Sequence, residues 1–439
     1  MSGRIDFAMN LGDKPNSHKR RSDRGGLLYI FGDFSGQARV DNWPPTFVRI
    51  DRDNFDEVMA KLAVAIEVGP DIRLAFTCIE DFHPDVWLPQ VDLLADLLSV
   101  KEMLQNPATA ARAAASIQAF LPSATQDDVV TESQPSAEGD EAMWMRLLGK
   151  LPDDEKPADS VADWVKQMVS PHIVQPVSAS QQDLARAADE LLSQFTRVIL
   201  HDAGFQGLEA RWRATFSLLQ EERAEHYTVY LVDMSMQALQ QLLKTETTAL
   251  AACLNQHGAS RDDEAEVLVV ADWVLTATPD AADLLSRCGD FARLCGGRFL
   301  AGGDVGFCQS LLVDAGSIPG LDDNLLLAYP RYLSRLPYHP KIDPLERFDF
   351  TECDELPAAE ELAWANAAFL VARTLLRGED NAAGFFADVP VFSYVQNGEA
   401  VLQPGAETVL SEAQANALLV RGIVPVLGFH QRRGVRVVL

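Results

Sequence analysis

Short apolar segments that end at Gly or Asp alternate with amphipathic helical patterns along most of this chain. The first apolar run, at residues 27–36, is stopped by a Gly-Asp turn, and a short strand at 47–50 follows it. Asp53 or Asn54 then caps a helix whose apolar face holds Phe55, Val58, Met59, Leu62 and Ile66. Strands that alternate with helices indicate packed layers, so we expect an α/β fold (α+β mixed layers).

The alternation continues beyond this first unit. A strand at 73–78 leads through His83 and Pro84 into an amphipathic helix that includes Leu88, Val91, Leu94, Ala95, Leu98 and Met103. Further on we expect helices at 181–195, 207–222, 236–243 and 281–294 and strands at 227–233 and 267–270. Residues 295–304 (CGGRFLAGGD) predict a buried strand that ends in a glycine turn.

One segment divides the chain. Residues 121–141 are rich in Ser, Thr, Pro, Gly, Asp and Glu, and their few apolar residues do not recur at a regular spacing. The predicted organisation is therefore a polar N-terminal tail (1–25), a first domain (26–120), an acidic flexible linker (121–141), short amphipathic helices (142–180) and a second domain (181–439).

The short helices after the linker have two interpretations. One helix spans residues 141–151 and the other spans residues 160–169, and each is too short to be stable alone. They either dock on another protein or fold back onto their own domain. The candidate interaction residues are Trp144, Leu147, Leu148 and Trp164.

Composition excludes several classes of protein. The chain has 64 acidic and 37 basic residues, and its net charge of −27 repels nucleic acid. No apolar run is long enough to cross a membrane and the N-terminus has no secretory pattern, so we expect a cytoplasmic protein that contacts neither nucleic acid nor membrane. The six cysteines are scattered without metal-ligand spacing, and we predict no metal or other cofactor.

No segment has the pattern of a reaction centre. Trp212, between Arg211 and Arg213, is expected to bury its indole while the arginines bond acidic partners or water. Asp33 and Ser35 lie in a turn, where such side chains bond nearby backbone, and His83 is expected to cap a helix. We therefore predict a non-enzymatic protein. An α/β nucleotide-binding or hydrolytic enzyme, using the glycine-rich residues 295–306 with Asp272 or Asp304, is the alternative from another class.

Three segments of the N-terminal part carry a family resemblance: GDFSG at 32–36, FVRIDRDNFDEV at 47–58 and FTCIEDFHP at 76–84. In this order they resemble the small subunit of the type VI secretion system contractile sheath. The C-terminal part resembles the large sheath subunit, through VILHDAGFQGLEARWR at 198–213, PRYLSRLPY at 330–338, DPLERFDF at 343–350, WANAA at 364–368 and, more loosely, residues 404–427.

The resemblance implies a structural component of a type VI sheath or sheath-like assembly, with the two subunits fused in one chain and the large subunit's C-terminal extension missing beyond Leu439. It implies a role in sheath assembly or capping, or else a simplified sheath built from this chain alone. The implied partners are sheath subunits or other copies of the chain, an AAA+ sheath-recycling ATPase that binds near residues 143–148, and baseplate or cap proteins.

Overall fold

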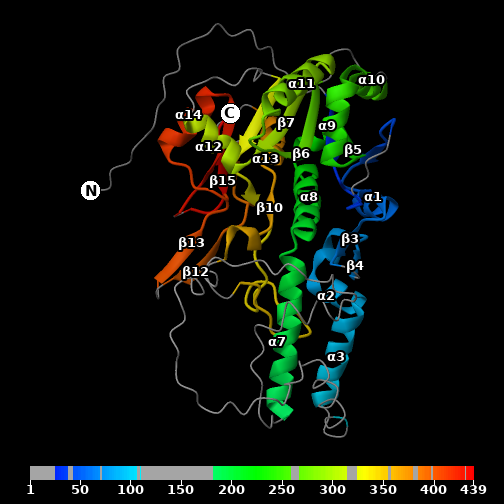
Figure 1. The fold of residues 1–439 in the computed structure, drawn as a ribbon, viewed down its shortest axis with the longest axis vertical. Helices are drawn as coiled ribbons and strands as arrows, with labels where there is room; N and C mark the ends of the chain where they lie inside the picture. Colours follow the sequence, from blue (N-terminus) through cyan, green and yellow to red (C-terminus); the bar gives the residue numbers. More distant parts are fainter. Residues whose placement is uncertain are drawn as a thin grey trace, which may run out of the picture.

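A nine-stranded sheet lies at the centre of the computed structural model, which describes residues 25–37, 43–69, 72–105, 109, 181–258, 266–313, 324–353, 357–378, 384–396, 399–430 and 432–439 (Figure 1). The six central strands run parallel, and antiparallel strands complete both edges. The strand order across the sheet is β11 (Phe385–Phe386), β15 (Val435–Val437), β14 (Ile423–Gly428), β8 (Leu325–Tyr329), β7 (Arg298–Gly303), β6 (Glu266–Leu275), β1 (Gly26–Gly32), β5 (Tyr227–Asp233) and β2 (Phe47–Ile50).

Helices cover both faces of this sheet, as the near-continuous apolar character of its strands requires. Successive side chains of β1 point to opposite faces. Leu28 and Ile30 join the core on one face, which contains residues of α8 (Ala203–Leu219) and α13 (Ala368–Arg377). Tyr29 joins the core on the other face, which contains residues of α9 (Met236–Thr245), α10 (Thr247–Gly258), α11 (Ala281–Leu294), α12 (Val305–Val313) and α14 (Glu412–Val420).

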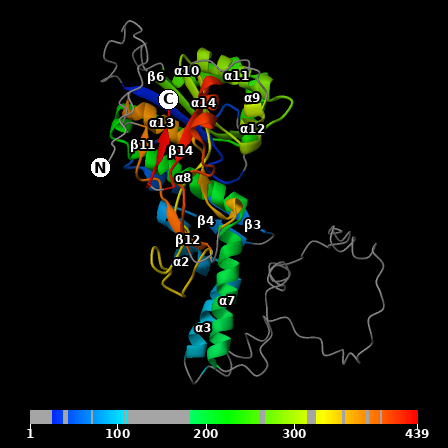
Figure 2. The ribbon, with the colours of Figure 1, turned by 90° about the vertical axis from the view of Figure 1, so that its left-hand side faces the viewer.

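The remaining elements of the N-terminal part pack beside α8. They form a two-stranded sheet and a series of short helices: α1 (Phe55–Leu62), β3 (Ala65–Val68), β4 (Ile72–Ala75), η1 (Ile79–Phe82), α2 (Pro84–Trp87) and η2 (Leu88–Gln90). The chain then continues into α3 (Asp92–Gln105), which lies side by side with α7 (Gln181–Leu200) and projects away from the sheet in both views (Figures 1 and 2).

The two projecting helices are antiparallel and come from opposite sides of the predicted linker. Val100 and Leu104 of α3 pack with Leu184 and Ala188 of α7. Lys101 Nζ lies 2.7 Å from Asp189 Oδ1 beside this apolar contact. The N-terminal part (described residues 25–109) and the C-terminal part (181–439) therefore meet in the projection as well as in the sheet.

Small elements complete the C-terminal part. A hairpin of β12 (Phe392–Gln396) and β13 (Glu399–Gln403) stands apart from the central sheet in Figure 1. Ser411 caps α14 through a reciprocal bond with Gln414. The other elements are η4 (Glu222–His226), β9 (Tyr332–Leu333), η5 (Ala359–Glu361) and β10 (Trp364–Ala365).

The expected α/β class is confirmed, and most of the expected strands and helices occur. Three details differ. Ile66 belongs to β3 and not to the preceding helix, because Ala63 at φ 52° ends α1. The helix expected from Leu88 begins at Asp92, since a 3-10 turn containing Pro89 precedes it. The helix expected at 207–222 is α8, which runs from Ala203 to Leu219, and its Phe216 is 37% exposed.

Candidate functional site

The candidate site is the junction of the N-terminal and C-terminal parts. Its centre is β1, which lies between β5 and β6. The register with β5 runs from Gly26 opposite Tyr227 to Gly32 opposite Asp233, and all seven residues of β1 take part. A strand of the N-terminal part is thus hydrogen-bonded on both sides by strands of the C-terminal part.

The turn after β1 fixes an aromatic contact. Phe34 is fully buried, and its ring centroid lies 5.2 Å from that of Trp212 in an edge-to-face arrangement. Trp212 Nε1 donates a hydrogen bond to the Phe34 carbonyl oxygen at 3.0 Å, so the buried indole has its polar partner. Phe55 of α1 packs edge-on against the same indole. The burial expected of Trp212 is confirmed.

Polar contacts hold the same turn on the sheet. Ser35 N donates to Asp233 Oδ1 at 2.9 Å, which joins the turn to the end of β5. Arg211 donates to the Asp33 carbonyl oxygen at 2.6 Å and to Asp272 Oδ2 at 2.5 Å. Asp33 Oδ1 accepts from the backbone N–H of Gln37, as expected of a turn residue. Asp233 and Arg211 of the C-terminal part therefore hold the Asp-x-Ser-Gly turn of the N-terminal part in place.

A second aromatic cluster joins the FTCIEDFHP segment to the start of α8. Phe76 and Phe82 stack with ring centroids 4.3 Å apart, and Phe205 packs edge-on against both. Trp87 completes the cluster and donates its Nε1–H to the Phe82 carbonyl oxygen. His83 caps α2 by accepting from Asp85 N at 3.2 Å, so its predicted structural role is confirmed.

A buried network of charges lies against α8. Arg335 is 8% exposed and donates to both carboxylate oxygens of Glu209, at 3.0 and 2.9 Å. Its other two nitrogens donate to Glu352 at 2.7 and 3.0 Å. Glu352 also accepts from Tyr338 N, and Arg213 donates to Glu209 at 2.9 Å. The network fixes residues 335–352 against α8.

The protonation of this network follows from its partners. Burial raises the pKa of Glu209, but the guanidinium groups of Arg335 and Arg213 outweigh burial and hold the pKa below its usual value. Burial lowers the pKa of His201, whose Nε2 lies 3.8 Å from Glu352. Glu209 is therefore ionised and His201 is neutral at pH 7, which suits a structural cluster.

The residues of the alternative enzyme interpretation have structural contacts. A pocket of about 220 Å³ lies at the carboxyl ends of β1, β5 and β6, and Asp272 and Arg211, which line it, bond each other. Asp304 Oδ1 accepts from Phe307 N in the first turn of α12, and Gly302 and Gly303 lie in β7. Within the described ranges, no group of three or more His, Cys, Asp or Glu side chains is placed to hold a metal ion, and no helix is long and apolar enough to cross a membrane.

Sequence reasoning missed the buried charge network because its partners are far apart in the chain. One signal was present: Glu209 lies on the same face of the predicted helix as Trp212, and a carboxylate on an apolar face needs a buried cation. The candidate interaction residues Trp144, Leu147, Leu148 and Trp164 lie outside the described residues, as do both of their predicted helices.

Comparisons with known proteins match the two parts separately. Residues 25–134 match the family T6SS_VipA, described as "Type VI secretion system, VipA, VC_A0107 or Hcp2". Residues 322–434 match the family VipB, described as "EvpB/VC_A0108, tail sheath N-terminal domain". A relative, "Type VI secretion system sheath protein TssC1" of Pseudomonas aeruginosa, is 25% identical over 227 residues, covering 45% of this chain.

The match spans less than half of that relative's own length, 46%. The two family matches nevertheless fall on the two parts that meet at β1, and they occur in the order expected from the sequence motifs. Both matched families are structural sheath families. This chain therefore joins small-subunit (VipA) and large-subunit (VipB) sequence of the type VI secretion sheath in one polypeptide.

Proposed function

We propose that the chain is a fused sheath protomer, which supplies one small-subunit part and one large-subunit part to a type VI contractile sheath in the cytoplasm. The observation that carries the proposal is the position of β1, a strand of the VipA-like part, between β5 and β6 of the C-terminal part. Fusion fixes the ratio of the two parts at one to one. The role is structural, in assembly or capping of the sheath, and other sheath subunits or copies of the chain are its partners.

The first test asks whether the two parts stay together once the covalent connection between them is cut. A protease site placed within residues 121–141 allows the purified chain to be cut after folding. We expect the two fragments to elute together in size-exclusion chromatography and to separate only in denaturant, because β1 is paired on both sides. Fragments that separate in native buffer would contradict the shared sheet.

The second test asks what the protomer assembles into. Negative-stain electron microscopy of the chain alone, and after mixing with separate sheath subunits from the same source, gives distinct outcomes. Filaments or rings formed alone support a self-sufficient sheath, whereas particles bound only at sheath ends support a cap. A chain that neither assembles nor joins sheath filaments contradicts the proposed function.

Binding of a sheath-recycling AAA+ ATPase belongs to the same proposal. Its candidate contact residues are Trp144, Leu147 and Leu148, with Trp164 in the second helix. A pull-down with the ATPase, comparing the wild-type chain with W144A/L147A, measures this contact. Equal capture of both proteins would reject these residues as the docking site.

A further inference from the structure

Residues near the C-terminal end of the sequence form a basic stretch in this acidic chain. Residues 413–439 contain four arginines and no Asp or Glu, whereas the whole chain has a net charge of −27. Arg421 lies at the C-terminal end of α14. The other three arginines lie around the turn between β14 and β15 and are exposed together with His430. We call this group, His430, Arg432, Arg433 and Arg436, the arginine rim.

The turn that carries the arginine rim is packed onto the sheet edge. Gly434 has φ +87°, and a Cβ there would lie 2.3 Å from the Phe386 carbonyl oxygen, so the turn approaches β11 closely. The guanidinium of Arg432 lies 4.0 Å from the ring centroid of Phe385 and 5.9 Å from that of Phe429. The turn and the charge of Arg432 are thus held against the edge of the sheet.

A surface of opposite sign lies around α2 and α3. Residues 74–100 contain no Lys or Arg. The neighbouring loop at 341–349 exposes three carboxylates and only two cations, Lys341 and Arg347. We call the acidic floor the exposed group Glu80, Asp92, Asp96, Asp343, Glu346 and Asp349.

The acidic floor is built by both parts of the chain. Glu346 N donates to Asp85 Oδ2 at 2.8 Å, which ties the loop to α2. His83 Nε2 lies 3.7 Å from Asp343 Oδ1 across the same junction. The acidic floor therefore exists as one surface only when the two parts are packed together.

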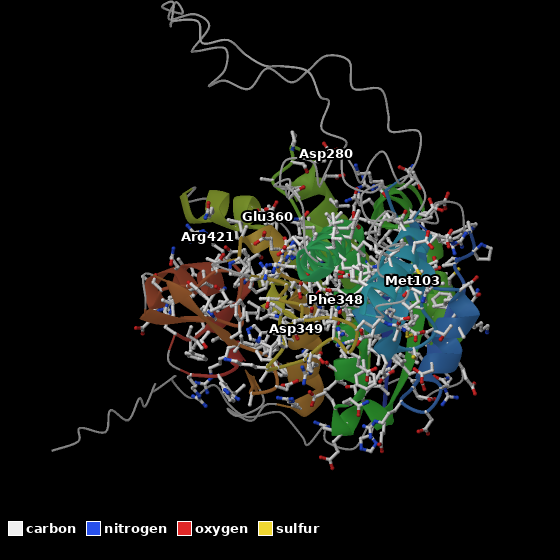
Figure 3. All side chains as sticks on the ribbon, turned by 90° about the horizontal axis from the view of Figure 1, so that it is seen from below. Met103, Asp280, Phe348, Asp349, Glu360 and Arg421 are labelled. Carbon is white, nitrogen blue, oxygen red and sulfur yellow. The ribbon has the colours of Figure 1, made fainter. Side chains whose placement is uncertain are left out.

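The two surfaces lie on different sides of the molecule. In Figure 1 the C-terminal strands, in red, lie on the left, and α2 and α3 lie at the lower right. Seen from below, Asp349 of the floor lies near the middle, and Arg421, which belongs to the basic stretch but not to the rim, lies off to one side (Figure 3). Contact between unlike patches on two copies is heterologous, and such contacts repeat into rings or filaments.

We propose that the arginine rim of one copy docks on the acidic floor of a second copy. The inference rests on the proposed function, because it names the contact by which fused protomers associate. Charge complementarity selects the occupant: a chain of net charge −27 repels nucleic acid, whereas a second copy offers the rim a dense group of carboxylates. The contact is electrostatic and weakens with salt.

The test is a charge swap followed by sedimentation velocity at low and high salt. R432E/R433E makes the rim net negative, and D96K/D349K replaces two of the floor's six carboxylates by cations. The matched controls on α11, R287E/R293E and D283K/D290K, make the same charge changes at exposed positions elsewhere. Circular dichroism and the thermal midpoint of each variant confirm folding.

We expect each reversal alone to weaken self-association at low salt by about tenfold or more, and both controls to associate like wild type. An equimolar mixture of the two variants regains pairwise association, because the unchanged rim of the floor variant then meets the unchanged floor of the rim variant. Wild-type association falls at high salt.

Three results would overturn the contact: a wild-type chain that is monomeric at low salt, association indifferent to both reversals, or no recovery in the mixture. These outcomes are separable from failure of the proposed function. If the chain enters sheath filaments and neither reversal changes its self-association, the proposed sheath role stands and only the contact between rim and floor is rejected. If the chain never joins a sheath, the sheath role is rejected, whatever effect the rim substitutions have on self-association.

Discussion

Replacing Arg335 by Met tests whether the buried charge network holds the C-terminal loop on α8. The substitution preserves an apolar stem of similar length but leaves the carboxylates of Glu209 and Glu352, which are 0% and 2% exposed, without the cation that bonds all four of their oxygens. Removing one partner of a buried ion pair costs about 3–5 kcal/mol. We expect a loss of stability in that range at pH 7.5, measured as the midpoint of urea unfolding followed by tryptophan fluorescence.

The pH dependence of the same variant gives a second readout. In wild type the pKa of Glu209 lies below its unfolded value of about 4.3, so its stabilising contribution is present above that pH and is lost as the pH falls through the folded pKa. Without Arg335, one of the two guanidinium groups that oppose burial is gone, so the pKa of Glu209 is expected to be higher in the variant than in wild type. The stability deficit of the variant against wild type therefore narrows as the pH falls from 7.5 to about 5.

Arg287→Met is the matched control for Arg335→Met. Arg287 pairs with Asp283 on the surface of α11, where the two side chains are 37% and 59% exposed. Loss of such a pair costs less than about 1 kcal/mol. An R335M protein that unfolds within about 1 kcal/mol of wild type, with no narrowing toward pH 5, would refute the assignment of the network as a buried clamp.

Three further predictions concern the same junction. Phe34→Ala, at a fully buried ring against Trp212, is expected to cost about 3–5 kcal/mol in urea unfolding, and a cost below about 1 kcal/mol would contradict that packing. Gly302→Ala is expected to destabilise the protein by about 1–3 kcal/mol, because the added Cβ would lie 2.7 Å from Asn366 Oδ1. Gly207→Ala, where α8 leaves open space for a Cβ, is expected to stabilise the protein by about 0.5–1 kcal/mol. Thermal midpoints equal to that of wild type would contradict both predictions. Burial raises the pKa of the Cys295 and Cys353 thiols to about 12, so at pH 8 both should react with iodoacetamide much more slowly in the folded than in the urea-unfolded chain, as mass spectrometry can measure.

Local patterns predicted much of the fold because each depends on residues close in the chain. The apolar run of β1, the start of α1 after Asn54, the cap at His83 and the face of α8 with Trp212 are all of this kind. Asn54 precedes α1 as expected, but its side chain accepts from Asp51 N and makes no capping bond to the helix. The position of β1 between β5 and β6 is different, because the pairing joins residues about two hundred positions apart and any apolar parallel strand has the same pattern. The partnership of Glu209 with Arg335 is non-local in the same way.

The central position of β1 also explains what fusion of the two parts changes physically. Both faces of β1 are apolar, and both of its edges are paired with strands of the C-terminal part. β1 therefore cannot pair stably before β5 and β6 have formed. In separate chains this pairing is a bimolecular event that loses translational and rotational freedom. A connecting segment makes it intramolecular, and the entropy of closing the loop rises only slowly with its length. The connection thus favours a paired sheet at concentrations where separate subunits would dissociate, and every protomer then presents an acidic floor assembled from both parts.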